Sequence, residues 1–100
     1  MGLKNTSAAL GYQQITSLSA ATNLTVPTRN PVSGMQQQPT MAIIIAQTQA
    51  VRWRDDGVAP TATVGMPLPV GVPLVYDGPL QNIQFIEQTA SAALNISYYY

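Results

Sequence analysis

Apolar and polar side chains alternate along several short segments of the chain, which is the pattern of β-strands that bury one face. In the Val-Arg-Trp-Arg segment at 51–54, the two apolar residues point one way and the two arginines the other. In the segment 82–87, Ile83 and Phe85 fall on one face and Gln84 and Ile86 on the other, and near the end of the sequence Leu94, Ile96 and Tyr98 alternate with polar residues. The alternation and the β-branched content together predict strands over residues 22–26, 50–54, 72–76, 82–87 and 94–100.

The strongest strand signal is the segment 41–47, Met-Ala-Ile-Ile-Ile-Ala-Gln. Three consecutive isoleucines are apolar on both faces, which suits a central strand that is covered on both sides. The segment 50–54 follows after a short break, so we predict that these two strands are antiparallel neighbours.

Turn-forming residues separate the predicted strands. Asp55-Asp56-Gly57 predicts a turn, because Asp side chains bond nearby backbone amides and Gly tolerates positive φ. β-type residues resume at 61–64. The stretch 65–73 has too many Pro and Gly residues for a helix or an inner strand. The segment 28–40, which contains two prolines and a glycine, is predicted to be a loop, either one that contacts a partner or a surface connection without a binding role.

Short strands with turns between them and almost no helical pattern indicate an all-β fold. We therefore expect a single small β-sandwich, jelly-roll-like, with an extended N-terminal arm. Residues 1–21 are the arm or a first strand, and residues 22–100 form the sandwich domain.

Charged residues are unusually rare. They make up 8% of the 100 residues, against roughly 25% in an average soluble domain. The formal net charge is +0, so little self-repulsion keeps copies apart. This composition predicts a surface covered by copies of the chain or by partners; the alternative is a monomer with an uncharged polar surface.

Without a basic excess, nucleic acid is not an expected partner. The longest apolar run, 41–46, is far short of the ~20 residues that cross a membrane, so no membrane partner is expected either.

The residue types available for catalysis are few. The chain has no Cys and no His, which removes thiolate metal sites, the commonest general base and the commonest transition-metal ligand. The four acids are Asp55, Asp56, Asp77 and Glu87, and the adjacent pair would face opposite ways on a strand. Calcium binding by these acids has no supporting spacing. We therefore predict no catalytic, cofactor-binding or metal site, and expect that the chain is not an enzyme.

Two groups of residues are candidates for structural or interaction roles. The two arginines at 52 and 54 either contact an anionic group of a partner or form ion pairs with Asp55, Asp56 or Glu87 and stack on an aromatic ring. The three terminal tyrosines either alternate between the inner and outer faces of a strand or anchor a partner. The candidate residues are Arg52, Trp53, Arg54, Asp55, Asp56, Gly57, Tyr98, Tyr99 and Tyr100.

Several short motifs follow one another from residue 13 onward. They are Gln-Gln-Ile-Thr at 13–16, Leu-Thr-Val-Pro at 24–27, Ala-Ile-Ile-Ile-Ala-Gln at 42–47, Val-Arg-Trp-Arg-Asp-Asp-Gly at 51–57, Pro-Thr-Ala-Thr-Val-Gly-Met-Pro-Leu at 60–68, Ile-Gln-Phe-Ile-Glu at 83–87 and Ala-Leu-Asn-Ile-Ser-Tyr-Tyr at 93–99. Their order resembles a group of small virion structural proteins of tailed bacteriophages. Such proteins commonly serve as capsid decoration (cement) proteins, head spikes, or connector and tail components.

The resemblance implies a non-enzymatic homo-oligomer, often a trimer, located on the outside of the phage head with the major capsid protein as its partner. The arm before residue 22 and the segment 28–40 are the expected contacts. A second hypothesis is a neck or tail adaptor or a fibre-associated subunit. A third, of another class, is a carbohydrate-binding β-sandwich in which Trp53 or the terminal tyrosines stack on sugar rings.

Overall fold

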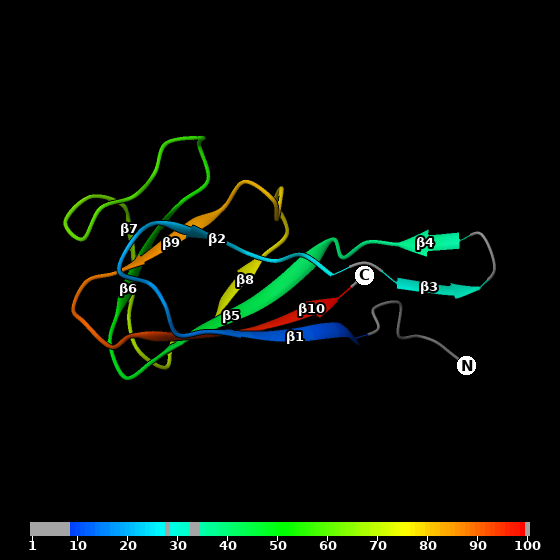
Figure 1. The fold of residues 1–100 in the computed structure, drawn as a ribbon, viewed down its shortest axis with the longest axis horizontal. Coiled ribbons are helices and arrows are strands. Elements are labelled where there is room, and N and C mark those ends of the chain that lie inside the picture. Colours follow the sequence, from blue (N-terminus) through cyan, green and yellow to red (C-terminus); the bar gives the residue numbers. More distant parts are fainter. Residues whose placement is uncertain (1–8, 28, 33–34, 100) are drawn as a thin grey trace.

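The computed structural model describes residues 9–27, 29–32 and 35–99 (Figure 1). Within these ranges the regular secondary structure consists of ten β-strands and contains no helix, so none could cross a membrane. Eight strands form two antiparallel sheets of four in a sandwich-like arrangement. The predicted all-β class is confirmed.

Each sheet combines strands from distant parts of the chain. The first sheet has the order β1-β10-β5-β8 and the second has the order β2-β9-β6-β7, while β3 and β4 pair separately as a hairpin. The strands are β1 (Ala9–Ile15), β2 (Thr22–Asn23), β3 (Arg29–Val32), β4 (Met35–Gln37), β5 (Met41–Gln47), β6 (Val51–Arg54), β7 (Met66–Leu68), β8 (Leu74–Tyr76), β9 (Gln84–Glu87) and β10 (Ala93–Tyr99).

The pairing within the two sheets is nested. With the hairpin set aside, the first strand pairs with the last (β1 with β10), the second with the second-last (β2 with β9), then β5 with β8 and β6 with β7. Two further pairings join the strand pairs within each sheet: β10 with β5 in the first sheet and β9 with β6 in the second. These nested pairs lie alternately in the first sheet (β1–β10 and β5–β8) and in the second (β2–β9 and β6–β7).

The core lies between the two sheets and follows the alternation of the sequence. Leu94, Ile96 and Tyr98 of β10 are fully buried, and so are Phe85 of β9 and Ile83 directly before it. These inward positions confirm the predicted faces of both segments. The complete core also includes Ile15, Leu18, Leu24, Ala42, Ile44, Ala46, Val51, Leu68, Tyr76, Leu80 and Ala92.

A partly buried polar contact at the margin of this core links the two sheets. The Tyr98 hydroxyl donates to Oε1 of Gln13 on β1 at 2.7 Å, and the same oxygen accepts the backbone N–H of Thr25 at 3.1 Å. Thr25 lies just after β2 of the second sheet, so one amide oxygen joins β10, β1 and the chain that leaves β2.

The predicted neighbour relation between 41–47 and 50–54 is wrong. β5 lies inside the first sheet and β6 inside the second. Thr48, with φ of 70°, turns the chain out of the first sheet directly after β5, and the short link then crosses to the other layer. As predicted, β5 is an inner strand, but its outward isoleucines, Ile43 and Ile45, are only half-buried.

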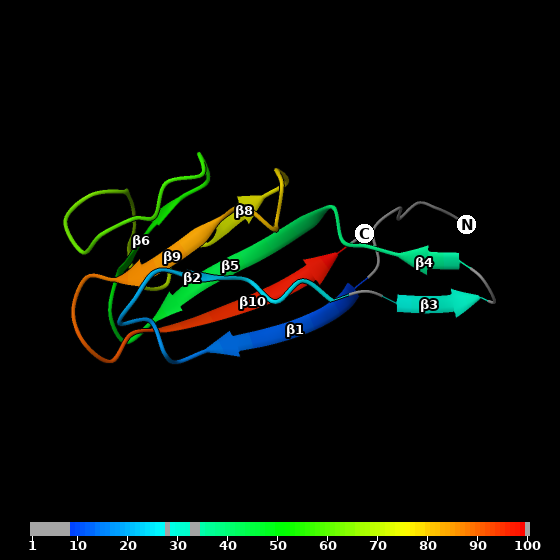
Figure 2. The same cartoon turned by 45° about the horizontal axis from the view of Figure 1, so that its top comes forward.

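The prediction of a loop over 28–40 is also wrong. The segment contains the β3–β4 hairpin, in which Arg29 pairs with Gln37 and Val32 with Met35, with an irregular register between them. Pro31 lies within β3 because each strand of a two-stranded hairpin has a free edge, where the missing N–H is tolerated. Figures 1 and 2 show the hairpin projecting from one end of the sandwich.

Smaller differences occur at the edges of the sheets. The predicted strand 22–26 shortens to β2, although Leu24 is buried and Val26 half-buried as the alternation indicated. Residues 61–64, whose residue types are typical of strands, form a tight bend, and β7 begins only after it. The predicted strand 72–76 shortens to β8, an edge strand that begins directly after Pro73. Of the predicted arm, residues 9–15 form β1; residues 1–8 lie outside the described residues.

Candidate functional site

The segment 51–57 begins as an inner strand of the second sheet. β6 lies between β9 and β7, so that Trp53 has Phe85 on one side and Met66 on the other. Val51 is fully buried, whereas Trp53 is half-buried and packs against the core. Its ring and that of Tyr76 meet in a T-shaped arrangement, with 65° between the ring planes and 6.1 Å between the centroids. The alternation predicted this inward face correctly.

Arg52 holds the connection between β6 and β7. Its guanidinium donates from Nε to the carbonyl oxygen of Ala62 at 3.1 Å and from Nη1 to that of Gly65 at 2.9 Å. The structure thus favours a role inside the domain, as one of the two alternatives held, but the partners are carbonyls. The expected ion pair of Arg52 is replaced because the bend at 61–64 brings carbonyl groups to the guanidinium.

Arg54 forms the ion pair that Arg52 does not. Its Nε donates to Oδ1 of Asp56 at 3.0 Å, and its Nη2 lies 2.5 Å from Oδ2, so the contact is bidentate. The hydrogen bond with Arg54 holds the pKa of the Asp56 carboxyl below its usual range and raises the pKa of Arg54. Gly57 follows with φ of 86°, which confirms the predicted turn. Both side chains remain solvent-accessible, so the pair orders the turn and contributes little stability.

Asp55 links this turn to the first sheet. Its Oδ2 accepts a hydrogen bond from the hydroxyl of Tyr76 on β8 at 2.8 Å. Burial, together with this bond to a carboxylate, raises the pKa of Tyr76 to about 12. Asp55 therefore has a phenol as its partner where the sequence suggested an arginine, because the fold brings β8 beside the end of β6.

A shallow hollow of about 380 Å³ opens beside this turn. Its lining combines the polar turn with exposed apolar side chains from the start of β7: Arg54, Asp55, Asp56, Val64, Gly65 and Met66. The carboxyl groups at its rim already have partners, Tyr76 for one and Arg54 for the other. The last three lining residues were missed by the sequence analysis, although a single glycine between the apolar residues Val64 and Met66 was a signal.

Gly65 is required where the chain closes against β6. Its φ is 144°, and an added Cβ would lie 3.1 Å from Cβ of Arg52, 3.2 Å from Cβ of Pro60 and 3.2 Å from the carbonyl oxygen of Trp53. We expect Gly65→Ala to lower the free energy of unfolding by about 2–4 kcal/mol through backbone strain and overpacking. Urea titration followed by tryptophan fluorescence measures the change.

Gly57 supplies the matched control for this substitution. Its φ of 86° is also positive, but no atom lies within 4 Å of an added Cβ. Gly57→Ala should therefore cost only the backbone strain, about 1–2 kcal/mol. Equal losses at the two positions would contradict the close packing inferred around Gly65.

The terminal tyrosines separate by face. Tyr98 is fully buried in the core, whereas Tyr99 is half-buried on the opposite face, where its hydroxyl accepts a hydrogen bond from Oγ of Ser97 at 3.2 Å. Alternate rings therefore pack inward, as one interpretation held, and Tyr98 cannot anchor a partner. Tyr100 lies outside the described residues.

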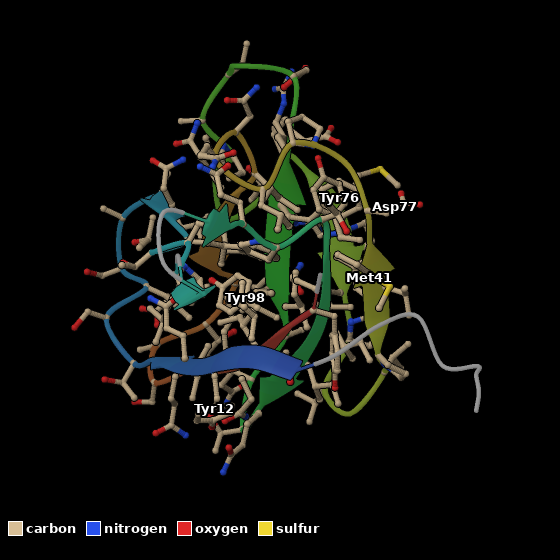
Figure 3. All side chains as sticks on the ribbon, turned by 90° about the vertical axis from the view of Figure 1, so that its right-hand side faces the viewer. Tyr12, Met41, Tyr76, Asp77 and Tyr98 are labelled. Carbon is tan, nitrogen blue, oxygen red and sulfur yellow. The ribbon has the colours of Figure 1, made fainter. Side chains whose placement is uncertain are left out.

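The sequence analysis missed the outer face of the first sheet. Tyr12 stands on this face, on the side of β1 opposite to Tyr98 (Figure 3), and is 65% exposed. Its hydroxyl donates to Oδ1 of Asn95, as does Nε2 of Gln14 at 3.1 Å, and Nδ2 of Asn95 donates to Oε1 of Gln47 at 3.0 Å. These four side chains form an amide ladder across β1, β10 and β5.

No charged residue occurs in the four strands of this sheet. Beside the amide ladder, its outer face carries mainly apolar side chains: Met41, Ile43, Ile45, Val75 and Tyr99. Val75 of β8 is 61% exposed. The irregular spacing of apolar residues before residue 18 concealed the strand that completes this face.

Within the described ranges, no three acidic side chains come together to hold a metal ion. Glu87, the fourth acid, accepts the backbone N–H of Ala92 at 3.3 Å. Comparisons with protein families, characterised proteins and solved structures found no match to this chain. The class established by the structure is therefore a small all-β protein with two facing antiparallel sheets.

Proposed function

We propose that the chain is a structural protein of a virus particle: a capsid decoration protein of the tailed-bacteriophage type that binds and stabilises the head as an oligomer. The observation that carries the proposal is the uncharged outer face of the first sheet, where Tyr12 is 65% and Val75 61% exposed. Contiguous apolar and amide side chains without charge are typical of surfaces that other proteins cover.

The strand order supports the same proposal. A long antiparallel hairpin rolled into two four-stranded sheets is the arrangement of a jelly roll, and we infer that this is the fold. The nested pairs β1–β10, β2–β9, β5–β8 and β6–β7 carry this inference. Jelly rolls occur repeatedly in viral capsid proteins and in lectins. The fold alone does not choose between these two, since one fold serves many functions.

The internal roles of the polar candidates support a structural function. Arg52, Arg54, Asp55 and Asp56 make hydrogen bonds that order the chain between β6 and β7 or join it to β8. The β3–β4 hairpin, which projects beyond the sandwich (Figure 2), is the proposed contact with the major capsid protein. Because few charges are present, binding to the head should depend only weakly on ionic strength.

The proposal is tested by co-sedimentation of the purified chain with heads assembled from the major capsid protein encoded in the same genome. We expect saturable binding in hundreds of copies per head, nearly unchanged when the salt concentration is raised. Binding of a single ring of copies at the neck or tail would favour the adaptor or fibre-associated alternative. No binding to any part of the particle, or a genome without capsid genes, would overturn the virion proposal.

Carbohydrate binding is a second candidate, favoured by Tyr12. This ring is exposed and lies beside the amides of Gln14 and Asn95, which is the combination that stacks on a sugar and bonds its hydroxyls. Trp53 does not suit this role, because it is half-buried and packs edge-on against Tyr76. Glycan-array binding that is lost in Tyr12→Ala would support this candidate, and an array without any bound glycan would remove it.

A further inference from the structure

The two sheets have four edge strands, and three of them are poor templates for another strand. β2 has two residues and β7 and β8 have three each. β7 also contains Pro67, and Pro73 lies directly before β8. Short length and proline are the usual means by which proteins prevent edge-to-edge pairing.

β1, the fourth edge, has none of these features. It has seven residues, Ala-Leu-Gly-Tyr-Gln-Gln-Ile, with neither a charge nor a proline. Its only irregularity is a register shift between Ala9 and Gly11, after which Gly11–Ile15 pair regularly with β10. In the part of the chain that the structure describes, the β1 main chain pairs with β10 alone, and Figure 2 shows its other side free.

We propose that β1 pairs antiparallel with β1 of a second copy of this chain, joining two first sheets into one continuous eight-stranded sheet. Two identical strands related by a two-fold axis present matching backbone donors and acceptors to each other, so the contact is self-complementary and closes as a dimer. The inference goes beyond the proposed function, because it needs no capsid.

The charge distribution favours a second copy as the occupant. Lysine on an edge strand blocks pairing, but the first sheet has no charged residue in any strand, and the chain as a whole has no net charge. Between the described residues of this edge, two copies therefore approach without like-charge repulsion. A charged partner, in contrast, would find no complementary group there.

The amide ladder supports the same contact. It runs from Gln47 through Asn95 and ends at the sheet edge with Gln14, whose Nε2 is bonded to Asn95. Among the described residues, the Oε1 of Gln14 has no hydrogen-bond partner. In the dimer, this oxygen and the exposed Tyr12 lie next to the outer-face side chains of β1 in the second copy. The ladder of polar side chains therefore continues across the two-fold axis.

The test is the native mass of the full chain and of Gln14→Lys, measured by light scattering behind a sizing column. The wild-type chain should have twice the 10.7 kDa of one chain. Gln14→Lys, which places one positive charge per copy near the axis without touching the core, should raise the dissociation constant at least tenfold. The matched control is Val75→Lys, which places the same charge on the opposite edge of the same sheet and should leave the dimer intact.

Hydrogen exchange provides the second measurement. In wild type, the backbone amides of Gly11–Ile15 that point away from β10 should exchange slowly. In Gln14→Lys the same amides should exchange rapidly, while those of β10 stay protected. A wild-type monomer, or a trimer, would overturn the proposal. So would equal loss of the dimer in Val75→Lys, which would assign the contact to the face of the sheet. Head binding is measured separately, so its failure leaves the mass result intact.

Discussion

Truncation of Tyr98 to alanine is expected to lower the free energy of unfolding by about 3–5 kcal/mol, the range for large aromatic side chains in cores. Tyr98 is fully buried, and its hydroxyl donates to Oε1 of Gln13 at 2.7 Å. The substitution removes a ring from between the two sheets and one of the polar contacts that join them. Because small domains are stable by only about 5–15 kcal/mol in total, the loss is a large fraction.

Urea unfolding followed by the fluorescence of Trp53 measures this loss, with all variants at one chain concentration so that self-association contributes equally. The matched control is Tyr99→Ala, one residue along on the outward face, which should lose about 1 kcal/mol or less. If Tyr98→Ala does not fold, Tyr98→Phe keeps the ring and removes only the hydroxyl, at a cost of about 1 kcal/mol. Similar losses for Tyr98→Ala and Tyr99→Ala would contradict the inward placement of Tyr98.

Alkaline pH is expected to destabilise the fold between about pH 10 and pH 12. Burial raises the pKa of Tyr98 to about 12, and burial with the hydrogen bond to Asp55 raises that of Tyr76 to about 12, against about 10 for a free tyrosine. The folded chain thus keeps two phenolic protons that the unfolded chain has already released. The stabilisation is complete below pH 10 and is lost as the pH approaches 12, by up to about 3 kcal/mol per tyrosine.

Urea midpoints measured from about pH 8 to pH 12 test this dependence. Tyr76→Phe and Tyr98→Phe should each remove about half of the alkaline loss, because each variant lacks one of the two titrating groups. The double variant should be nearly independent of pH over this range. Unchanged stability of the wild-type chain up to pH 12, or an unchanged alkaline loss in the double variant, would contradict the role of the buried phenols.

Local pattern was sufficient wherever the physical cause acts within a few residues. The inward faces of 82–87 and 94–98 were predictable because successive side chains of a strand point to opposite sides of the sheet. The turn at 55–57 was predictable because Gly57 supplies the positive φ and Asp56 bonds the neighbouring N–H of Val58. The all-β class followed from the same local signals.

Contacts between distant segments could not be predicted in this way. The alternation of 41–47 and 50–54 indicates two strands but contains no information on their partners, which are set by the packing of the whole core. The hydrogen bond between Asp55 and Tyr76 depends on β8 lying beside the end of β6, 21 positions apart in the sequence. The amide ladder likewise joins residues more than 80 positions apart.

The sequence by itself determined that this protein is a β-protein with inward faces at known positions, with few charges and with no Cys or His for catalysis. These properties depend on residue type and on the two-residue period of a strand. Only the tertiary structure decided which strands share a sheet, that Arg52 bonds carbonyls while Arg54 bonds Asp56, and that β1 is the one long unprotected edge among the described strands. The reason is that strand pairing is chosen by the joint packing of all segments, and no segment carries that information alone.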